Sequence, residues 1–296
     1  MPIILDHKLR EQITHDAAIF PITYFHDELA ALPDYAGPLH WHLDFEIATA
    51  AYGILDFQVG SQHITLKAGE SIFVNGNMLH GIRQVSGDAP DPMPNIVFSG
   101  TLIAPETAAI YQKYVQPIAS SDTLPFIVFD QKNGWHDEVN RSVKNIYLQM
   151  ERKGPCYEMA VQRELNSIFE KIFLHFEELP RSETTRIQIS AQIRIQKMLS
   201  YIYEHYAEDV TLEDIAAAAN VSRSEAGRCF KTYMGSSPID VLIRHRLQTA
   251  HSMLKDETLT LQEISSLCGF NCVNYFSRQF KKVYGYTPGK LRALGK

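Results

Sequence analysis

The C-terminal stretch GFNCVNYFSRQFKKVYGYTPGKLR, residues 269–292, combines a turn glycine, an aromatic stripe at helical spacing, basic residues and a closing pair of turn signals. An earlier stretch, NVSRSEAGRCFKTYMGSSPIDVLI at residues 220–243, follows the same plan. Self-similarity at a fixed offset indicates that one supersecondary unit occurs more than once. The chain therefore carries a small helical unit twice.

Each copy opens with Thr-x-x-acid, in TLEDI at residues 211–215 and TLQEI at residues 260–264. In such a capping box the Thr oxygen accepts from a free amide at the helix start, and the acid reaches back to the backbone. A residue that tolerates positive φ then ends each first helix, Asn220 in one copy and Gly269 in the other. We expect Ser222 and Asn271 to cap the second helices.

Each second helix is predicted to end at a glycine, Gly235 or Gly285, and a Ser-Pro or Thr-Pro pair then starts the next helix. A helix from about 239 to 255 would join the copies as a rod of ~25 Å. Each copy therefore has a helix, a short turn and a second helix with a basic exposed face, which is the helix-turn-helix plan. One copy alone could be an ordinary helical hairpin, but two that agree in caps, turns and basic positions favour helix-turn-helix units at 212–233 and 260–283.

Residues 193–294 resemble the C-terminal domain of the AraC/XylS family of bacterial transcription regulators, and residues 269–292 fit that family's second motif nearly throughout. The resemblance implies a DNA-binding domain of two helix-turn-helix units joined by one long helix. Neighbouring major grooves on one face of DNA lie ~34 Å apart, so a rigid rod would let one chain read two of them. The resemblance makes double-stranded promoter DNA the expected partner and allows RNA polymerase as another.

The outward face of each second helix supplies the candidate DNA contacts, while Phe276 and Phe280 should enter the core. Arginine suits guanine edges and asparagine suits adenine edges, whereas lysines neutralise phosphates. Arg228 and Arg278, at an offset of 50, are the expected base readers together with Asn274. Gly227 can read no base and costs its helix ~1 kcal/mol relative to Ala. The full predicted set is Arg223, Ser224, Arg228, Lys231, Val273, Asn274, Ser277, Arg278, Lys281 and Lys282.

The charge of the 296-residue chain is uneven, since residues 187–296 carry +4 within a total of −6. A basic end on an acidic chain favours contact with a polyanion there. The four cysteines form no C-x-x-C pair, which favours a reduced, cytoplasmic setting. No apolar run approaches ~18 residues, so we expect no membrane span and no signal peptide.

Short β-like runs, FEIATAAYG, ILDFQVGSQHITL, SIFVN and NIVFS, lie between residues 19 and 100, and Gly60-Ser61 is typical of a hairpin turn. They predict an antiparallel sandwich or small barrel over residues 1–104. Residues 105–179 are predicted to be helical, with apolar stripes that could pack on the β unit, on each other or on a second chain as a dimer interface. A linker is expected at 180–190, before the domain at 191–296.

The segment GPLHWHLDFE and a later histidine supply the spacing of a cupin metal site, H-x-H-x-x-x-E on one strand with His80 some 35 residues on. Three histidines and a carboxylate suit Fe, Mn, Ni or Zn. The segment also resembles the cupin-like sensor domain common in this regulator family, in which the barrel usually holds a small effector, often a sugar, and H-x-H frequently survives without bound metal. An effector pocket, a bound metal and purely structural histidines are therefore the three alternatives. Asn75-Gly76-Asn77 departs from the usual Pro-x-Gly. The predicted effector-binding residues are His40, Trp41, His42, Glu46 and His80. If a metal binds, its expected ligands are the same residues without Trp41.

The sequence thus predicts an α+β chain with an N-terminal antiparallel cupin-like barrel, packed helices and an all-α DNA-binding domain of two helix-turn-helix units. We expect a cytoplasmic, homodimeric transcription regulator without a resident cofactor that responds to a small molecule, with a carbohydrate as one candidate class. The alternative is a metal-dependent cupin enzyme with a DNA-binding appendage. No G-x-S-x-G, Walker or G-x-G-x-x-G motif is present, and we expect no enzyme.

Overall fold

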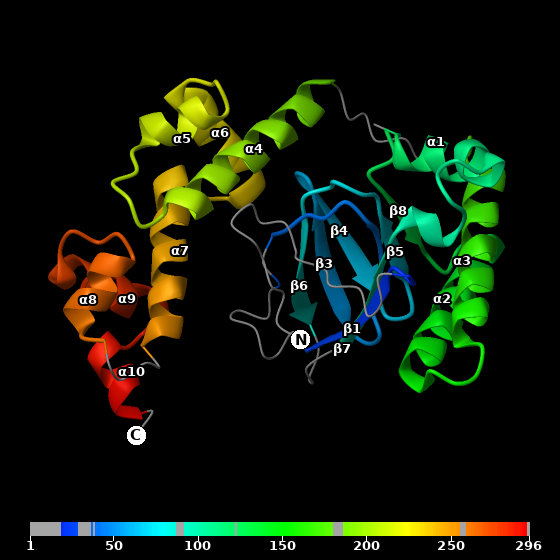
Figure 1. Cartoon of the computed structure of the whole chain (residues 1–296), viewed down its shortest axis with the longest axis horizontal. Helices are drawn as coiled ribbons and strands as arrows, with labels where there is room; N and C mark the ends of the chain where they lie inside the picture. The colour runs from blue at the N-terminus through cyan, green and yellow to red at the C-terminus, as the bar shows by residue number, and fades with distance from the viewer. Residues whose placement is uncertain are drawn as a thin grey trace. The chain divides into compact units, whose positions relative to one another are not determined.

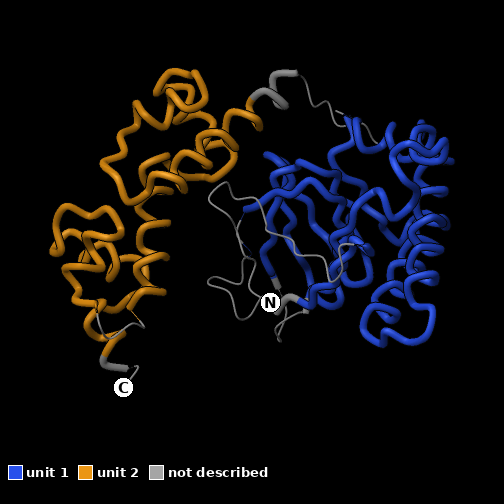
Figure 2. The backbone as a smooth tube through the Cα atoms, viewed as in Figure 1, with its two compact units in different colours: residues 1–6, 10–189 blue, residues 7–9, 190–296 orange. Residues whose placement is uncertain are grey.

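The computed structural model describes residues 19–28, 37, 39–86, 92–121, 123–179, 186–254 and 259–294. The chain forms two compact units and passes from the first to the second between Ile189 and Ser190 (Figure 2). Each unit is described by itself below.

The first unit contains two antiparallel sheets (Figure 1). The larger sheet has the strand order β1-β7-β2-β5-β8, with β1 at Ile22–Glu28, β2 at Phe45–Thr49, β5 at Ser71–Val74, β7 at Pro92–Phe98 and β8 at Phe126–Phe129. The smaller sheet has the order β4-β3-β6, with β3 at Ile54–Val59, β4 at Gln62–Lys67 and β6 at His80–Ser86. The predicted hairpin joins β3 to β4 through Gly60 (φ 60°) and Ser61, and is confirmed.

Three layers stack in this unit. One apolar core, which includes Leu55, Phe57, Ile72 and Val74, lies between the two sheets. The second core lies between the other face of the larger sheet and the helices, where Phe45, Phe73 and Phe98 surround Phe169. The helical elements are η3 Gly100–Leu102, η4 Tyr111–Val115, α1 Gln116–Ala119, α2 Gly134–Arg152 and α3 Tyr157–Leu174. Figure 1 shows α2 and α3 side by side next to the sheets.

The prediction of a purely helical region at 105–179 is wrong at β8. The run FIVF pairs with β5 and extends the larger sheet, so these residues belong to the same compact unit as the strands before them. The apolar stripes predicted for α2 and α3 are confirmed, and both are buried within this unit. Tyr147 Oη of α2 donates to the carbonyl of Ile47 at 3.2 Å, which ties the helix to the sheet.

The second unit is all-helical. Its helices are α4 Arg186–His205, α5 Leu212–Ala218, α6 Arg223–Met234, α7 Pro238–Met253, α8 Leu261–Leu267, α9 Val273–Tyr284 and α10 Pro288–Leu294. Residues 186–190, predicted as the end of a linker, are the first residues of α4, while 180–185 lie outside the described residues. The 16 residues of α7 make a rod of ~24 Å that packs against both helix pairs, α5–α6 and α8–α9.

The predicted caps account for most helix boundaries in this unit. Capping boxes begin α5 at Thr211, α7 at Ser237 and α8 at Thr260. Positive φ values occur at both predicted turns, Asn220 (53°) and Gly269 (77°). One cap was predicted wrongly: α9 is preceded by Cys272 rather than Asn271, and that cap residue makes no side-chain cap hydrogen bond. The turn of the second copy is one residue longer, so the capping position moves along by one.

Candidate DNA-binding surface and buried polar cluster

The outward face of α6 is basic. Arg223, Ser224, Arg228 and Lys231 are all exposed, while Phe230 and Ala226 face the core. Ser222 accepts from the backbone N–H of Glu225 and fixes the start of the helix. This face therefore presents the side chains expected of a recognition helix.

Acidic side chains already contact both of its arginines. Arg223 Nη1 donates to Glu213 Oε1 at 2.7 Å, and Arg228 is paired with Glu225 one turn away. The lysine of this helix, Lys231, donates to the carbonyl of Gly235 at 3.2 Å.

The matching face of α9 differs in the contacts of its cations. Asn274, Arg278, Lys281 and Lys282 are exposed, while Val273 and Ser277 are half-buried. No acidic residue occurs in α9, and none of the ion pairs between described residues involves its three cations. The opposite face is apolar, where Phe276 and Phe280 are fully buried as the sequence predicted.

Arg246 anchors the connecting helix α7 within the second unit. Its guanidinium donates to the carbonyls of Tyr206 and Glu208, both at 2.7 Å, and lies over the ring of Phe270. Gly269 lies against the same chain segment, because a Cβ built there would be 2.5 Å from the Tyr206 carbonyl oxygen. These contacts hold the second helix-turn-helix on the end of α4 through α7.

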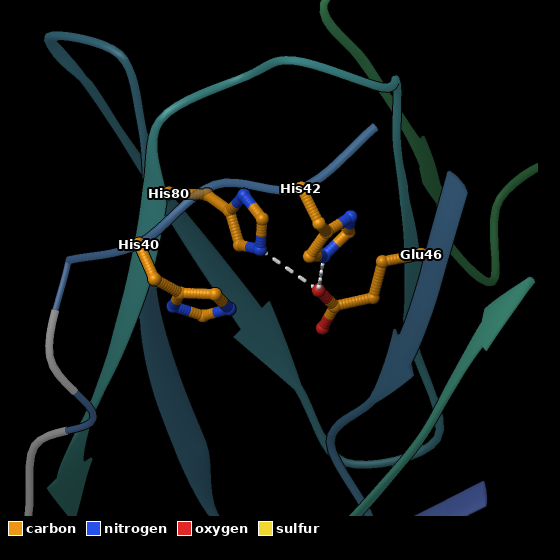
Figure 3. A group of neighbouring side chains, drawn as sticks. All are labelled: His40, His42, Glu46 and His80. Atoms are coloured by element: carbon orange, nitrogen blue, oxygen red, sulfur yellow. Dashed lines mark hydrogen bonds and ion pairs between the residues drawn. The ribbon is translucent and has the colours of Figure 1, made fainter. Parts of the chain in front are cut away.

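The first unit brings His40, His42, Glu46 and His80 into one cluster (Figure 3). One nitrogen or carboxylate oxygen from each residue lies within 4.8 Å of the others, and all four residues are buried. The sequence predicted these four residues but not the backbone segments that bring them together. A bend at Leu43-Asp44 separates His42 from β2, so the H-x-H pair and Glu46 do not share one strand. His40 instead forms a bridge with His80 through two backbone hydrogen bonds of 2.9 Å.

The turn Asn75-Gly76-Asn77 supports this cluster, a role that sequence reasoning missed. Asn77 N–H donates to the His42 carbonyl at 2.7 Å, and Asn75 Nδ2 donates to the carbonyls of Ile118 and Leu124. A Cβ on Gly76 would lie 2.3 Å from the Leu43 carbonyl oxygen. The available signal was the run of small turn-forming residues that follows a fully buried strand.

Backbone carbonyls fix the tautomers of two rings. His42 Nδ1 lies 2.9 Å from the Asp44 oxygen, and His80 Nδ1 lies 2.7 Å from the Met78 oxygen. Because a carbonyl only accepts, each Nδ1 carries its proton. Each Nε2 then faces Oε2 of Glu46, at 3.2 and 2.8 Å.

A ring protonated only at Nδ1 has no Nε2 proton to give the carboxylate. Each contact between an Nε2 and the Glu46 oxygen therefore needs either a second proton on the ring or a cation between the two atoms. Burial alone would raise the pKa of Glu46, but the two imidazoles outweigh it and hold that pKa far below its usual range. Imidazoles oriented by carbonyls and joined to a carboxylate are a donor set that fits Fe, Mn, Ni or Zn.

Trp41, the remaining predicted effector residue, lies between His40 and His42 and is half-buried. The four polar side chains that converge are His40, His42, Glu46 and His80. Trp41 does not join the buried cluster.

A family model described as a helix-turn-helix domain matches residues 215–293. The chain is 27% identical over 290 residues to the uncharacterized HTH-type transcriptional regulator YdeC of Bacillus subtilis (strain 168), which covers 96% of each protein. It is 25% identical over 268 residues to the HTH-type transcriptional activator RhaS of Salmonella schwarzengrund (strain CVM19633), or 88% of this chain and 89% of that relative. The xylose operon regulatory protein of Escherichia coli (strain K12) is 32% identical over 94 residues, which are 32% of this chain and 24% of that relative.

The paired helix-turn-helix units and the matched domain define a DNA-binding regulator of transcription. The helix-turn-helix domain at residues 215–293 is of the AraC type, and the relatives that match most of this chain are HTH-type regulators of transcription. The matched domain and these relatives are regulators of transcription, not enzymes, which counts against the cupin enzyme alternative. Within the described part of the chain, no helix has the length and apolar character to span a membrane.

Proposed function

We propose that this regulator reads a bipartite site in promoter DNA, with α6 in one major groove and α9 in the next. The observation that supports the proposal is the in-register repetition of Arg228 and Arg278 on the exposed faces of two helices that pack on one rod, α7. Arg228 and Arg278 contact guanine edges and Asn274 contacts adenine. Arg223, Lys231, Lys281 and Lys282 contact phosphates, and Ser224, Val273 and Ser277 line the same faces.

Selection of bound sequences from random duplex DNA tests this proposal. The wild-type chain should enrich two boxes about one helical turn apart. Arg228→Ala should relax one box and Arg278→Ala the other. Enrichment of a single box, or of none, would contradict two-groove reading.

We propose that the N-terminal unit responds to a small polar effector at the cluster of His40, His42, Glu46 and His80, with Trp41 at its edge. Support comes from four buried polar side chains that converge from the two sheets and the bridge. An effector changes DNA binding only if it binds one arrangement of the chain better than another. A carbohydrate is the first class to test, because one relative is named as a xylose operon regulator.

D-Xylose and a panel of other monosaccharides are the probes for this site. Thermal shift and calorimetry should show binding to the wild-type chain that His40→Ala and His80→Ala remove. The melting temperature of each variant without sugar provides the folding control. Sugar binding that survives both substitutions would place the effector elsewhere.

The tautomers of His42 and His80 favour a second candidate for the same cluster, a divalent transition metal. Elemental analysis of the purified chain and titration with Zn²⁺, Ni²⁺, Mn²⁺ and Fe²⁺ distinguish the two. Stoichiometric metal in the wild type that is lost in Glu46→Gln would favour the metal. An absence of metal binding leaves the sugar proposal as the account of the cluster.

We further propose that the chain acts as a cytoplasmic homodimer, with RNA polymerase as a partner at the promoter. The apolar faces predicted for a dimer interface are used inside the first unit, so a dimer must use other residues. Met159 and Leu174 on α3 are 70% and 71% exposed and are candidates. Light scattering of the wild-type chain and of the Met159→Glu, Leu174→Glu variant checks this proposal.

A further inference from the structure

A chain of ion pairs runs from α4 to the recognition helix α6. Arg194 Nη1 of α4 lies 3.2 Å from Glu225 Oε1, and Arg228 pairs with the other oxygen, Oε2. The Glu225 side chain is only 20% exposed, whereas that of Arg228 is 75% exposed. A half-buried carboxylate therefore joins an arginine of α4 to an arginine on the exposed face of α6.

This arrangement restricts the Arg228 side chain. Arg194 holds one oxygen of the carboxylate, so the second oxygen has a defined direction, and the Arg228 guanidinium follows it. A side chain that is ordered before binding loses less conformational entropy when it meets DNA. Ordering matters most here because Gly227, the neighbour of Arg228 on this face, has no side chain that could read a base.

The second helix-turn-helix shows that the fold itself does not need this carboxylate. At the offset of 50 that pairs Arg228 with Arg278, Tyr275 takes the place of Glu225. The cap of α6 also does not use the carboxylate, because Ser222 accepts from the backbone N–H of Glu225. An amide at position 225 would therefore keep the helix start intact.

We propose that Glu225 is a positioning residue for base readout by α6, and that Arg194 fixes Glu225 in turn. This inference rests on the proposed two-box function. Glu225 orients the guanidinium of Arg228 toward one guanine, so its loss weakens discrimination at that base pair and leaves the box read by α9 unchanged.

A purely electrostatic role makes a different prediction. A carboxylate close to DNA repels phosphates, so its removal would raise the affinity for every sequence alike. Glu213→Gln is the matched control, because it removes one negative charge from the same helix-turn-helix without touching Arg228. Gln262 occupies the equivalent position in the second copy, which shows that the fold accepts glutamine there.

The experiment measures dissociation constants of the full chain for the selected two-box DNA and for duplexes with each other base at the position that Arg228→Ala relaxes. Glu225→Gln should reduce the preference for guanine there about 3- to 10-fold, which is the range for losing one pre-ordered side chain. Arg194→Gln should reduce it by a smaller factor, and Glu213→Gln should leave it unchanged. Melting temperatures should stay close to that of the wild type.

Two outcomes overturn this inference alone. Equal gains in affinity for all duplexes in Glu225→Gln and Glu213→Gln would show a charge effect, and unchanged discrimination in Glu225→Gln would show no role. If the wild-type chain selects only the box that Arg278→Ala relaxes, α6 reads no bases and the proposed function fails with it. The number of boxes selected by the wild type therefore separates the two failures.

Discussion

The two helix-turn-helix units share one skeleton but differ in how their cations are held. Both begin with a capping box, turn through a residue at positive φ and end their second helix at a glycine with positive φ. In the first helix-turn-helix, Glu213 and Glu225 pair with the arginines of α6, whereas α9 in the second has three cations and no acid. The repeat thus fixes where the recognition helices lie, and the residues between the repeated positions decide how each helix can meet DNA.

The turns differ most in their tolerance of a side chain. Gly269 has φ 77° and would place a Cβ 2.5 Å from the Tyr206 carbonyl, whereas Asn220 has φ 53° and is exposed. Gly269→Ala should cost at least about 3 kcal/mol of unfolding free energy through strain and overlap, and Asn220→Ala only about 1 kcal/mol. Urea unfolding followed by far-UV circular dichroism measures both. Equal costs would mean that the turn residues are interchangeable.

A half-buried histidine lies on the side of α7 that packs against the end of α4. His245 packs against the rings of Tyr203 and Tyr206, and burial lowers its pKa to about 4 from the ordinary 6.5. The unfolded chain binds this proton more readily between those values, so stability is full above about pH 6.5 and falls toward pH 4, by up to roughly 3 kcal/mol. Unfolding free energies across this range should show the slope.

His245→Phe keeps an aromatic ring but has no proton to bind. The slope between pH 6.5 and 4 should flatten in this variant. A slope that persists unchanged would assign the pH dependence to another group.

The lysines of α9 should contribute affinity without sequence preference. Lys281→Ala and Lys282→Ala should each weaken binding by about 1 kcal/mol on every duplex and reduce the slope of log K against log salt by about one. Lys231→Ala in α6 is the comparison in the first helix-turn-helix, and its smaller expected effect follows from its hydrogen bond to the Gly235 carbonyl. Sequence-dependent losses would make these lysines base readers instead.

The smallest expected effect is at Gly227 in the middle of α6. A Cβ there meets nothing within 4 Å, so Gly227→Ala should stabilise the helix by about 0.5–1 kcal/mol. The measurement is the urea midpoint at unchanged slope. Destabilisation would show a contact of this position that the open space does not suggest.

Local chemistry explains which features could be predicted from the sequence. The capping boxes, the turn residues and the buried phenylalanines of α9 depend on neighbours within one or two turns, and they were predicted correctly. The strand β8 was missed because four apolar residues between helical patterns carry no periodicity. The bend between His42 and Glu46 was missed because the H-x-H-x-x-x-E spacing fits a continuous strand equally well.

Contacts between residues far apart in the chain could not be predicted from the sequence either. Arg194 and Glu225 are 31 residues apart, and no local pattern joins them. The support of His42 by Asn77 also depends on how two loops meet. Both are set by tertiary packing, which sequence periodicity does not encode.

Two-groove reading is tested most directly by a cycle that pairs each arginine variant with DNA in which one box is scrambled. Arg228→Ala should weaken binding to DNA with both boxes intact and to DNA in which only the α9 box is scrambled. It should have almost no effect on DNA in which the α6 box is scrambled. Arg278→Ala should show the same pattern with the two boxes exchanged. Costs that are the same on all three duplexes would mean that both arginines only contact phosphates, and the two-box account would be wrong.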